Sequence, residues 1–221
     1  MSEPEQAPTS VQPDPDATTP ARKRPKPGER RAQILQMLAT MLEQPGVERV
    51  TTAALASKLD VSEAALYRHF ASKAQMFEGL IEFIEQSVFG LVNQIIEREQ
   101  APDADAAEIG VRQASRIVAM LLHFGEKNPG MTRVMVGDAL VYENERLQQR
   151  MNQLFDKIES TLKQCLRPVV QAQGANTPTL DVQARASVLT AFVAGRLQRF
   201  ARSGFKRLPS EQLELCLSQM L

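Results

Sequence analysis

A chain of 221 residues without net charge is long enough for one small domain and one medium one. Hydrophobic residues make up 43% of it, aromatic residues only 5%, and Trp is absent, which favours an aliphatic, helical core. No apolar run approaches the roughly eighteen residues that a membrane span needs, so none is expected. Two cysteines, Cys165 and Cys216, and the lack of an apolar signal stretch predict a cytoplasmic protein in which both thiols are buried and unpaired.

The neutral average conceals an uneven distribution of charge. Residues 1–21 carry four acidic side chains and no basic one, whereas residues 22–73 carry ten Lys or Arg against five acids. The remaining residues hold sixteen bases and seventeen acids. Because a phosphate backbone attracts clustered basic charge, residues 22–73 are the part of the chain in which a nucleic-acid contact is expected.

Residues 1–27 contain seven of the thirteen prolines and almost no large apolar side chain. They cannot bury enough surface to offset the entropy of ordering, so a disordered, proline-rich arm is predicted. Its basic end, residues 22–26, could lie along phosphates or in a minor groove. The alternative is a solvated basic tail.

Beyond the arm, apolar residues recur at helical spacing and no segment alternates with the period of a strand, which predicts an all-α fold. The expected helices cover residues 29–43, 52–59, 63–70, 73–98, 104–124, 131–140, 143–166, 180–203 and 209–221. Ser62 and Ser72 are well placed as N-caps. Pro168 is expected to end or kink its helix, with a loop over residues 171–179.

Residues 51–73, TTAALASKLDVSEAALYRHFASK, have the features of a helix-turn-helix. Two short helices that cross steeply need a small residue at the crossing, and Ala56 meets that need. A tight turn is expected at Asp60 and Val61, where Asp60 stands at a position often held by Gly and can adopt the left-handed conformation at modest cost. The apolar residues expected to lock the two helices together are Leu55, Leu59, Val61 and Leu66. The second helix can then enter the major groove with its N-terminal turn.

The run Tyr67-Arg68-His69-Phe70-Ala71-Ser72-Lys73 resembles the end of the DNA-binding domain of TetR-type regulators, in which Tyr-x-His-Phe-x-x-Lys is characteristic. The similarity extends from the first expected helix to Lys73, and the helical remainder has the length and order of that family's dimerisation body. The resemblance implies a TetR-like fold. A three-helix, helix-turn-helix domain is expected over residues 28–72, and a helical domain for dimerisation and partner binding over residues 73–221.

The geometry of a docked helix-turn-helix and the family pattern together suggest the DNA contacts. Four residues are expected on phosphates: Thr51, Thr52, Tyr67 and Lys73. Five are expected on or near the groove-facing surface: Ser62, Glu63, Ala64, Ala65 and His69. The alanines can meet thymine methyl groups, and Glu63 can accept from cytosine N4 or, alternatively, only complement the dipole of its helix. For Tyr67 and His69 the alternative is partial packing in the core.

Four strings, VSEAALYRHF, LIEFIEQS, FGEKNPGMTR and LQQRMNQLFDKIE, resemble the nucleoid-occlusion branch of this family. That resemblance implies a homodimer that binds double-stranded DNA at palindromic chromosomal sites, is associated with the nucleoid, and antagonises the division GTPase FtsZ. It also suggests where FtsZ docks: at Phe83, and at Gly125, Lys127 and Asn128 in a polar turn nearby if the two long helices pair antiparallel. The alternative is that Phe83 is ordinary core and the turn an ordinary loop.

Dimerisation is expected through the last two helices, residues 180–203 and 210–221, which can form a four-helix bundle across a two-fold axis. The apolar side chains expected inside that bundle are Leu189, Phe192, Val193, Leu197, Leu213 and Leu217. Deleting the residues after Ser203 is therefore expected to give a monomer or an insoluble chain.

Two other functions stay open at this point. One is a ligand-responsive TetR-type repressor, although residues 104–166 offer few aromatic side chains for a ligand pocket. The other is an architectural chromosome protein without base preference, which a base-facing helix disfavours. Catalysis is not expected, because the only histidines, His69 and His123, lack neighbours at metal-ligand spacing; no cofactor or metal site is predicted.

Overall fold

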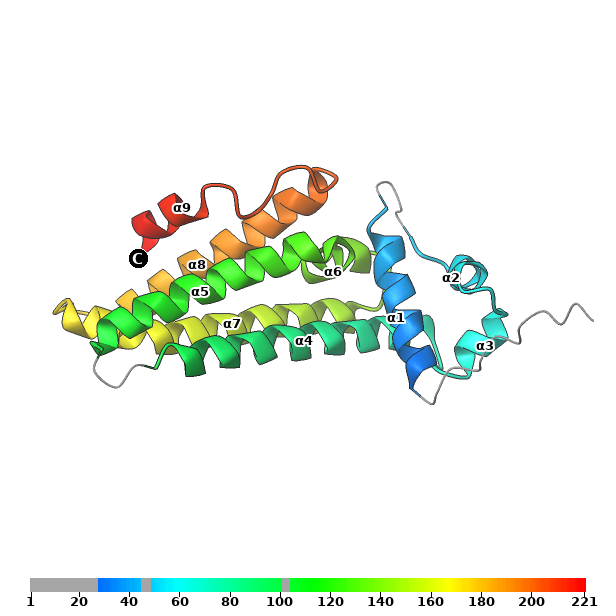
Figure 1. Ribbon diagram of the computed structural model, residues 1–221, viewed down its shortest axis with the longest axis horizontal. Coiled ribbons are helices and arrows are strands. Elements are labelled where there is room, and N and C mark those ends of the chain that lie inside the picture. Colours follow the sequence, from blue (N-terminus) through cyan, green and yellow to red (C-terminus); the bar gives the residue numbers. More distant parts are fainter. Residues whose placement is uncertain (1–27, 45–48, 101–103) are drawn as a thin grey trace, which may run out of the picture.

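The computed structural model describes residues 28–44, 49–100 and 104–221. In these ranges the chain is all helical and contains no strand, as predicted (Figure 1). The elements are α1 (Glu29–Leu42), α2 (Thr52–Lys58), α3 (Glu63–Tyr67), α4 (Lys73–Arg98), α5 (Ala106–Lys127), α6 (Pro129–Met135), the 3-10 turn η1 (Asp138–Leu140), α7 (Glu145–Ala172), α8 (Pro178–Arg202) and α9 (Leu213–Met220). The arm predicted over residues 1–27 lies outside the described residues.

Helices α1, α2 and α3 form one end of an elongated molecule, and the long helices α4, α5, α7 and α8 run side by side away from it (Figure 1). The short helix α6 lies where this bundle meets α1, and α9 lies on the outside of the bundle. Buried apolar residues from α1 through α9 belong to one core cluster. The N-terminal end is therefore packed onto the body rather than tethered to it by a linker.

The turn between α2 and α3 explains how these two short helices can cross steeply. The N–H of Val61 donates to the carbonyl of Ala56 (3.1 Å), and the N–H of Asp60 donates to that of Ser57 (3.2 Å). This pair of bonds is a Schellman ending, which needs a left-handed residue after the helix. Asp60 supplies it with a φ of 54°, as predicted. The side chains buried behind the turn are Leu55, Ala56, Leu66 and Phe70.

Three helices at this end begin with a hydroxyl that accepts from an amide of the first turn. The capping pairs, at 3.2–3.3 Å, are Thr51 with Ala54, Ser62 with Ala65 and Ser72 with Gln75. Each bond satisfies an N–H that would otherwise lack a partner within its helix. The predictions that Ser62 and Ser72 are N-caps are confirmed.

Ion pairs fix α4 against its two neighbours. Arg150 of α7 places Nε and Nη2 at 3.2 and 2.6 Å from the carboxylate oxygens of Glu85, and hydrogen bonding to Glu85 raises the pKa of Arg150. Near the end of α4, the carboxylate of Glu99 is only 8% exposed and pairs with Arg112 and Arg116 of α5. These pairs tie the middle of α4 to α7 and its C-terminal end to α5.

Several helix boundaries differ from the sequence prediction. α3 ends at Tyr67 rather than at residue 70, and α5 continues to Lys127 rather than ending at residue 124. The helix expected over residues 131–140 is divided into α6 and η1, because Gly137 adopts a left-handed φ of 83° between them. The last helix begins only at Leu213, after Gln212 in the left-handed region with a φ of 55°.

Helix α7 passes through Pro168 and continues to Ala172, so the expectation that the helix ends there is wrong. A proline inside a helix removes one backbone hydrogen bond and crowds the preceding turn. Leu166, Val169 and Val170, on both sides of Pro168, are buried in the described chain. Burial of these apolar side chains on both sides of Pro168 therefore favours continuation of the helix through the proline. The loop that follows is correspondingly shorter than predicted.

The side chains expected at a subunit interface are mostly inside this single chain. Leu189, Val193 and Leu197 of α8 are each 0% exposed, and Leu213 and Leu217 of α9 are 8% exposed. They cannot also form the interior of a bundle with a second copy, so this part of the sequence prediction is wrong. The physical reason is that α8 turns its most apolar stripe toward α5 and α7 of its own chain.

The two cysteines differ in their surroundings. Cys165 is 5% exposed, and burial raises the pKa of its thiol to about 11. Cys216 on α9 is only partly buried, and its Sγ accepts a hydrogen bond from Nη2 of Arg196 at 3.1 Å. The expectation that both thiols are buried is therefore confirmed for Cys165 and wrong for Cys216.

Candidate nucleic-acid interface

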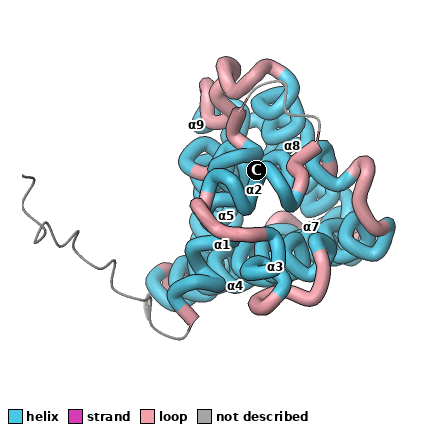
Figure 2. The backbone as a smooth tube through the Cα atoms, turned by 90° about the vertical axis from the view of Figure 1, so that its right-hand side faces the viewer, coloured by secondary structure: helices cyan, strands magenta, loops and turns pink. Residues whose placement is uncertain are grey.

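The residues expected to contact DNA lie on or directly beside α2 and α3 and at the start of α4. Figure 2 views the molecule from this end, with α2 and α3 toward the reader. Six of these residues are exposed: Thr51, Ser62, Glu63, Ala64, Tyr67 and His69. The partly buried ones are Thr52, Ala65 and Lys73. Tyr67 is 45% exposed and His69 is exposed as well, so neither side chain is buried in the core and both are accessible to a partner.

The hydroxyl groups of Thr51 and Ser62 cap α2 and α3 by accepting hydrogen bonds from their amides. An accepting hydroxyl keeps its own hydrogen, which can be donated to a phosphate oxygen. A helix N-terminus also presents amide hydrogens and a partial positive charge to an anion. Two capped N-termini on one exposed surface are thus compatible with contacts to a phosphate backbone.

Thr52 and Glu63 contact each other. The hydroxyl Oγ1 of Thr52 donates to Oε2 of Glu63 at 2.6 Å, which joins α2 to α3 on the exposed surface. The bond orients the carboxylate beside the first turn of α3, where the helix dipole also favours a negative charge. Thr52 was expected on a phosphate, and in this geometry its hydroxyl hydrogen is already donated to Glu63.

An arginine that was not among the sequence-predicted contacts adjoins this surface. The guanidinium of Arg31 lies 4.3 Å above the ring of Phe70, and its Nη1 donates to the carbonyl of His69 at 3.4 Å. The Arg30-Arg31 pair in the basic segment is the sequence signal that could have found it. Other exposed basic residues of this end are Arg49, Lys58 and Arg68.

Lys73 is the first residue of α4, and it is paired with an acid of the body. Its Nζ donates to Oε1 of Glu143, which precedes α7, and lies 5.6 Å from the centre of the Phe77 ring. The side chain of Lys73 is 19% exposed and that of Glu143 is 9% exposed. A phosphate would therefore have to compete with Glu143 for the ammonium group.

The four residues expected to bind FtsZ are not equally accessible. The Phe83 side chain is 49% exposed on α4, so the alternative that it is ordinary core is wrong. Lys127 is exposed and Asn128 is partly buried, with Nδ2 donating to the carbonyl of Phe124 at 2.8 Å. Gly125 is buried: a Cβ built on it would lie 2.4 Å from Cδ2 of Leu197. Gly125 therefore cannot contact a partner.

The expected polar turn at residues 125–128 also needs correction. Gly125, Glu126 and Lys127 belong to the last turn of α5, and Asn128 alone forms the junction with α6. The helix extends further than predicted because Gly125 is a packing residue, which needs a small side chain, and not a helix breaker. Lys127 and Asn128 remain the accessible members of the predicted set.

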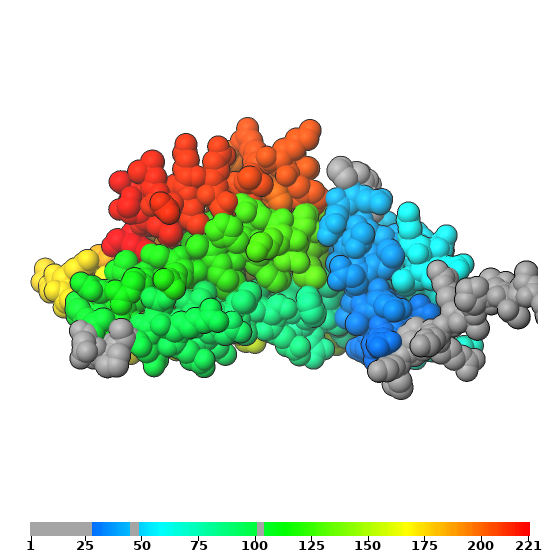
Figure 3. Space-filling model, in the orientation of Figure 1, coloured from blue at the N-terminus to red at the C-terminus, as the bar shows by residue number. Residues whose placement is uncertain are grey.

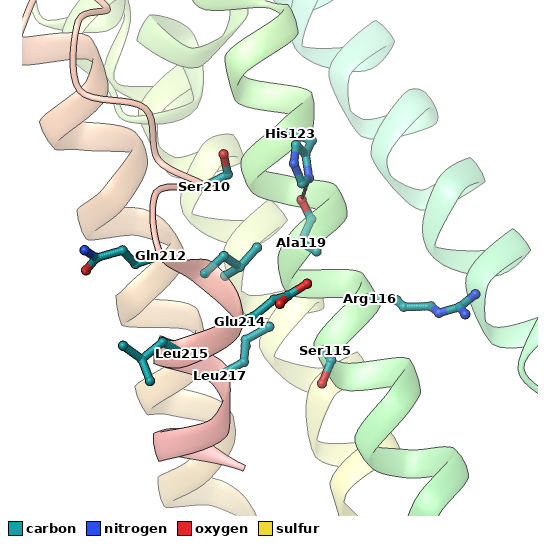
Figure 4. A pocket seen from close by; sticks show the side chains of 10 residues that line it. Ser115, Arg116, Ala119, His123, Ser210, Gln212, Glu214, Leu215 and Leu217 are labelled. Atoms are coloured by element: carbon teal, nitrogen blue, oxygen red, sulfur yellow. Dashed lines mark hydrogen bonds between the residues drawn. The ribbon is translucent and has the colours of Figure 1, made fainter.

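An open cleft of about 710 Å³ lies between α5 and α9 (Figure 4). Glu214 and Leu217 of α9 reach toward Ser115 and Ala119 of α5, whereas Leu215 points away. Nδ1 of His123 donates to the carbonyl of Ala119 at 2.7 Å. This cleft opens to solvent at the surface of the bundle.

Two kinds of feature are absent from the described residues. They contain no group of three or more His, Cys, Asp and Glu side chains arranged to hold a metal ion. Within the same ranges, no helix combines the length and the apolar character needed to cross a membrane. Both findings concern residues 28–44, 49–100 and 104–221 only.

Two family models match the chain. Residues 34–80 match the bacterial regulatory proteins of the tetR family, and residues 110–220 match the SlmA-like form of the tetracyclin repressor-like C-terminal domain. The second match alone spans half of the chain. Together the two matches cover both the helix-turn-helix and most of the helical body.

Solved structures share the fold at low sequence identity. The regulator FadR of Bacillus subtilis, solved with stearoyl-CoA, superposes with a TM-score of 0.65 at 14% identity over 86% of this chain and 96% of that one. PfmR of Thermus thermophilus, a TetR family regulator, gives 0.64 at 20% identity over 86% and 97%. These likenesses confirm the TetR fold.

Curated relatives are much more similar in sequence. The nucleoid occlusion factor SlmA of Aliivibrio fischeri strain MJ11 is 48% identical over 188 residues, which is 85% of this chain and 91% of that protein. SlmA of Vibrio vulnificus strain YJ016 is 48% identical over 190 residues, 86% and 92% of the two chains. SlmA of Vibrio cholerae is 47% identical over 186 residues, 84% and 90%. This chain belongs to the SlmA family of nucleoid occlusion factors, a branch of the TetR-type DNA-binding regulators.

Proposed function

We propose that this nucleoid occlusion factor binds palindromic double-stranded DNA as a homodimer and, in that state, antagonises FtsZ assembly, so that septa do not form over the nucleoid. Residues 28–72 act as the DNA-reading head, and residues 73–221 act as the body that dimerises and binds FtsZ. The protein works in the cytoplasm on chromosomal DNA. The observation that carries this proposal is that α4 belongs to both surfaces, with Lys73 at its first turn and Phe83 exposed further along.

The exposed N-terminal turn of α3 supports base reading. Ser62, Glu63 and Ala64 are exposed there, and Ala65 is partly exposed. Small side chains allow the helix backbone to approach the bases closely, and a carboxylate is an acceptor for cytosine N4. Thr51, Tyr67 and Lys73 flank this turn and set its register through phosphates.

The outer face of α8 supports a homodimer. Leu180 is 66% exposed and Val188 is 53% exposed, and the intervening position on the same face holds the exposed Ala184. The stripe continues with exposed Ala191. Small residues between and beside the two large ones, Ala184 and Ala191, let a second α8 approach closely across a two-fold axis. A homodimer presents two heads, which matches a two-part DNA site.

The exposed apolar surface of α4 supports the FtsZ site. Phe83 and Leu91 are 49% and 37% exposed, and they are eight residues apart, or about 12 Å along the helix axis. Nε2 of Gln113, in the first half of α5, donates to the carbonyl of Ile96, near the end of α4, so the two helices run antiparallel. Lys127 and Asn128 lie at the opposite end of α5. An apolar strip with a cation at its edge suits a peptide that carries both apolar and acidic side chains.

The alternative function is a ligand-responsive repressor. The observation in its favour is the cleft between α5 and α9, which combines Leu213 and Leu217 with His123 and Arg116. A ligand there would act on the C-terminal segment rather than on the centre of the bundle. Release of DNA by such a ligand, with no effect of the protein on FtsZ, would identify this function.

The test pairs two measurements on the same samples. DNA affinity is measured by fluorescence anisotropy with a selected palindrome and with a scrambled duplex, and FtsZ polymer mass is measured by sedimentation with each duplex. Phe83→Ala and Lys127→Glu should keep the DNA affinity of the parent protein and lose most of the FtsZ antagonism. Leu208→Ala, which truncates an apolar side chain that is 54% exposed elsewhere, is the matched control and should behave as the parent.

Three outcomes would count against the proposal. Equal FtsZ inhibition with palindrome, scrambled duplex or no DNA would reject coupling of the two activities. Full antagonism by Phe83→Ala and Lys127→Glu would reject the α4–α5 docking surface. Equal affinity for the palindrome and the scrambled duplex would indicate an architectural protein without base preference.

A further inference from the structure

The N-terminus of α6 is packed directly on the main chain of α1. A Cβ built on Gly130, the second residue of α6, would lie 2.0 Å from the carbonyl oxygen of Ala39 and 2.9 Å from its carbonyl carbon. Real Cβ atoms are essentially never closer than 3.0 Å to another heavy atom. The obstructing atoms belong to the backbone of a helix and cannot swing away as a side chain could. Glycine is thus required at this contact.

A second contact to the main chain of α1 comes from the same short helix. Nη1 of Arg133 donates to the carbonyl of Leu42 at 3.3 Å, at the C-terminal end of α1. The last carbonyls of a helix lack intrahelical partners, so a cation suits this position. Gly130 and Arg133 together hold two points of the α1 backbone, which fixes the position of that helix.

Helix α6 is itself held rigidly by the body. Oγ1 of Thr132, which is 0% exposed, donates to the carbonyl of Gly125 at 2.9 Å. A Cβ on Gly125 would lie 3.0 Å from that Thr132 hydroxyl and 2.4 Å from Cδ2 of Leu197 on α8. A series of close contacts therefore runs from α8 through α5 and α6 to α1. Tightly packed contacts of this kind transmit displacement instead of absorbing it.

We propose that the contact of Gly130 and Arg133 with α1 sets the separation of the two DNA-reading heads, and so determines the half-site spacing that the protein selects. This rests on the proposed function, because it requires a homodimer on a two-part site. The body fixes α6, α6 fixes α1, and α1 carries the α2–α3 reading unit through its buried core. Half-site spacing in a dimeric helix-turn-helix protein follows from the distance between its heads.

The discriminating variant is Gly130→Ala. The added Cβ must move from 2.0 Å to at least 3.0 Å from the carbonyl oxygen of Ala39, so α1 is displaced by about 1 Å. No residue of the DNA-reading surface is changed. The experiment measures anisotropy on duplexes that carry two half-sites separated by the parent spacing and by one or two base pairs more or fewer, and on a duplex with a single half-site. The affinity of Gly130→Ala at the parent spacing should fall about tenfold, the preferred spacing should change, and the affinity for the single half-site should stay within about twofold.

Gly90→Ala is the matched control. Gly90 is also a helical glycine, on α4, and a Cβ built on it meets nothing within 4 Å. This variant should follow the parent at every spacing. Arg133→Ala adds no bulk and removes one of the two contacts that hold α1, so it should broaden the range of half-site spacings that the protein binds. If circular dichroism shows that Gly130→Ala does not fold, Arg133→Ala provides the test instead.

The outcomes separate this inference from the proposed function. A parent protein that binds every spacing and a scrambled duplex equally would contradict the proposed function itself. A parent that prefers one spacing, with Gly130→Ala or Arg133→Ala weakened by the same factor on all duplexes including the single half-site, would indicate a purely structural role. An unchanged spacing profile in both variants would overturn the inference as well.

Discussion

Thr52 and Glu63 join the two helices of the helix-turn-helix through one hydrogen bond, from Oγ1 to Oε2 at 2.6 Å. The two residues are eleven positions apart and come from different helices. Their bond orients the Glu63 carboxylate at the exposed N-terminal turn of α3, where a base edge would be read. If Glu63 reads a base, as proposed, Thr52 would influence that contact without touching a base itself.

Thr52→Val should weaken base discrimination more than it weakens the fold. The variant keeps the shape of the side chain and removes the donor, which releases the Glu63 carboxylate. Because Glu63 is exposed, the free energy of unfolding should fall by no more than about 1 kcal/mol. The affinity for the specific duplex should fall about fivefold, whereas the affinity for a scrambled duplex should hardly change. Anisotropy and thermal unfolding provide the two measurements.

Thr161→Val is the matched control for this substitution. Its hydroxyl donates to the Lys157 carbonyl one turn earlier in α7, so the same atoms are removed without loss of a bond between helices. The control should bind both duplexes as the parent does. A loss of equal size on specific and scrambled DNA in Thr52→Val would show that Thr52 contacts phosphate and does not orient Glu63.

Lys73→Ala and Glu143→Gln should change DNA affinity in opposite directions. The ammonium of Lys73 pairs with Glu143 and must leave it to reach a phosphate. Lys73→Ala should weaken all duplexes about equally and reduce the salt slope by about one. Glu143→Gln removes the competing charge and should strengthen all duplexes a few-fold. Anisotropy over a salt series measures both effects.

The free energy of unfolding separates the structural role of the Lys73–Glu143 ion pair from the role of Lys73 in DNA binding. The Glu143 side chain is only 9% exposed, so Lys73→Ala leaves a carboxylate without its partner and should lower the free energy of unfolding by about 1–3 kcal/mol. The double variant should regain much of that stability while still binding DNA weakly. Lys163→Ala, which breaks an ion pair within α7, is the control. Unchanged DNA affinity in Glu143→Gln would contradict the competition.

Features that depend on neighbours in sequence could be predicted well. The N-caps at Ser62 and Ser72 and the left-handed turn at Asp60 follow from the chemistry of a few adjacent residues. The clustering of the DNA-binding candidates followed from the helix-turn-helix pattern, because helical spacing and one turn determine which residues share a surface. These parts of the fold and the site needed no knowledge of distant segments.

Features that depend on distant segments could not be predicted. Lys73 and Glu143 are 70 positions apart, and no local pattern indicates that they pair. Gly125 was expected in an exposed turn, but Leu197 of α8 covers it and makes it a packing residue. Pro168 was expected to interrupt α7, but burial of the residues around it keeps the helix intact. In each case a tertiary contact overrides the local preference.

DNA binding should depend steeply on salt. Two heads would neutralise on the order of 6–10 phosphates, and each neutralised phosphate releases part of the counterion atmosphere. The affinity for the palindrome should therefore fall by roughly three decades between 50 and 200 mM salt. The measurement is a salt titration by anisotropy. A flat response would contradict a model in which both heads dock on phosphates.

The two thiols should react at very different rates in the folded protein. Burial raises the pKa of Cys165 from its ordinary value of 9.0 to about 11, so at a given pH far less of it is thiolate. The thiolate is the reactive form, and the side chain is also shielded from reagents at 5% exposure. In Cys216→Ser, where Cys165 is the remaining thiol, Ellman's reagent should react slowly under native conditions and completely after denaturation. Fast native reaction would place Cys165 at the surface.

Val188→Glu should convert the proposed homodimer to monomers. Val188 is 53% exposed on the outer face of α8 in the single chain, so a charge there should leave the fold of each subunit intact. Near a two-fold axis the same charge would be buried next to its symmetry copy, where repulsion and loss of solvation both act against association. Analytical ultracentrifugation should find monomers, with thermal unfolding still cooperative.

The same variant should lose the advantage of two linked heads on DNA. Linking two binding modules raises affinity by about 10²–10⁴ over a single one, so the affinity of Val188→Glu for the palindrome should fall by about a hundredfold or more. Its affinity for a single half-site should equal that of the parent, because no head residue has changed. Val141→Glu is the control: Val141 is 63% exposed and lies between η1 and α7, outside α8 itself. If Val188→Glu remains a dimer, the next surface to test is that of the C-terminal segment, which stands out from the body in Figure 3 and carries Leu215 with 64% exposure.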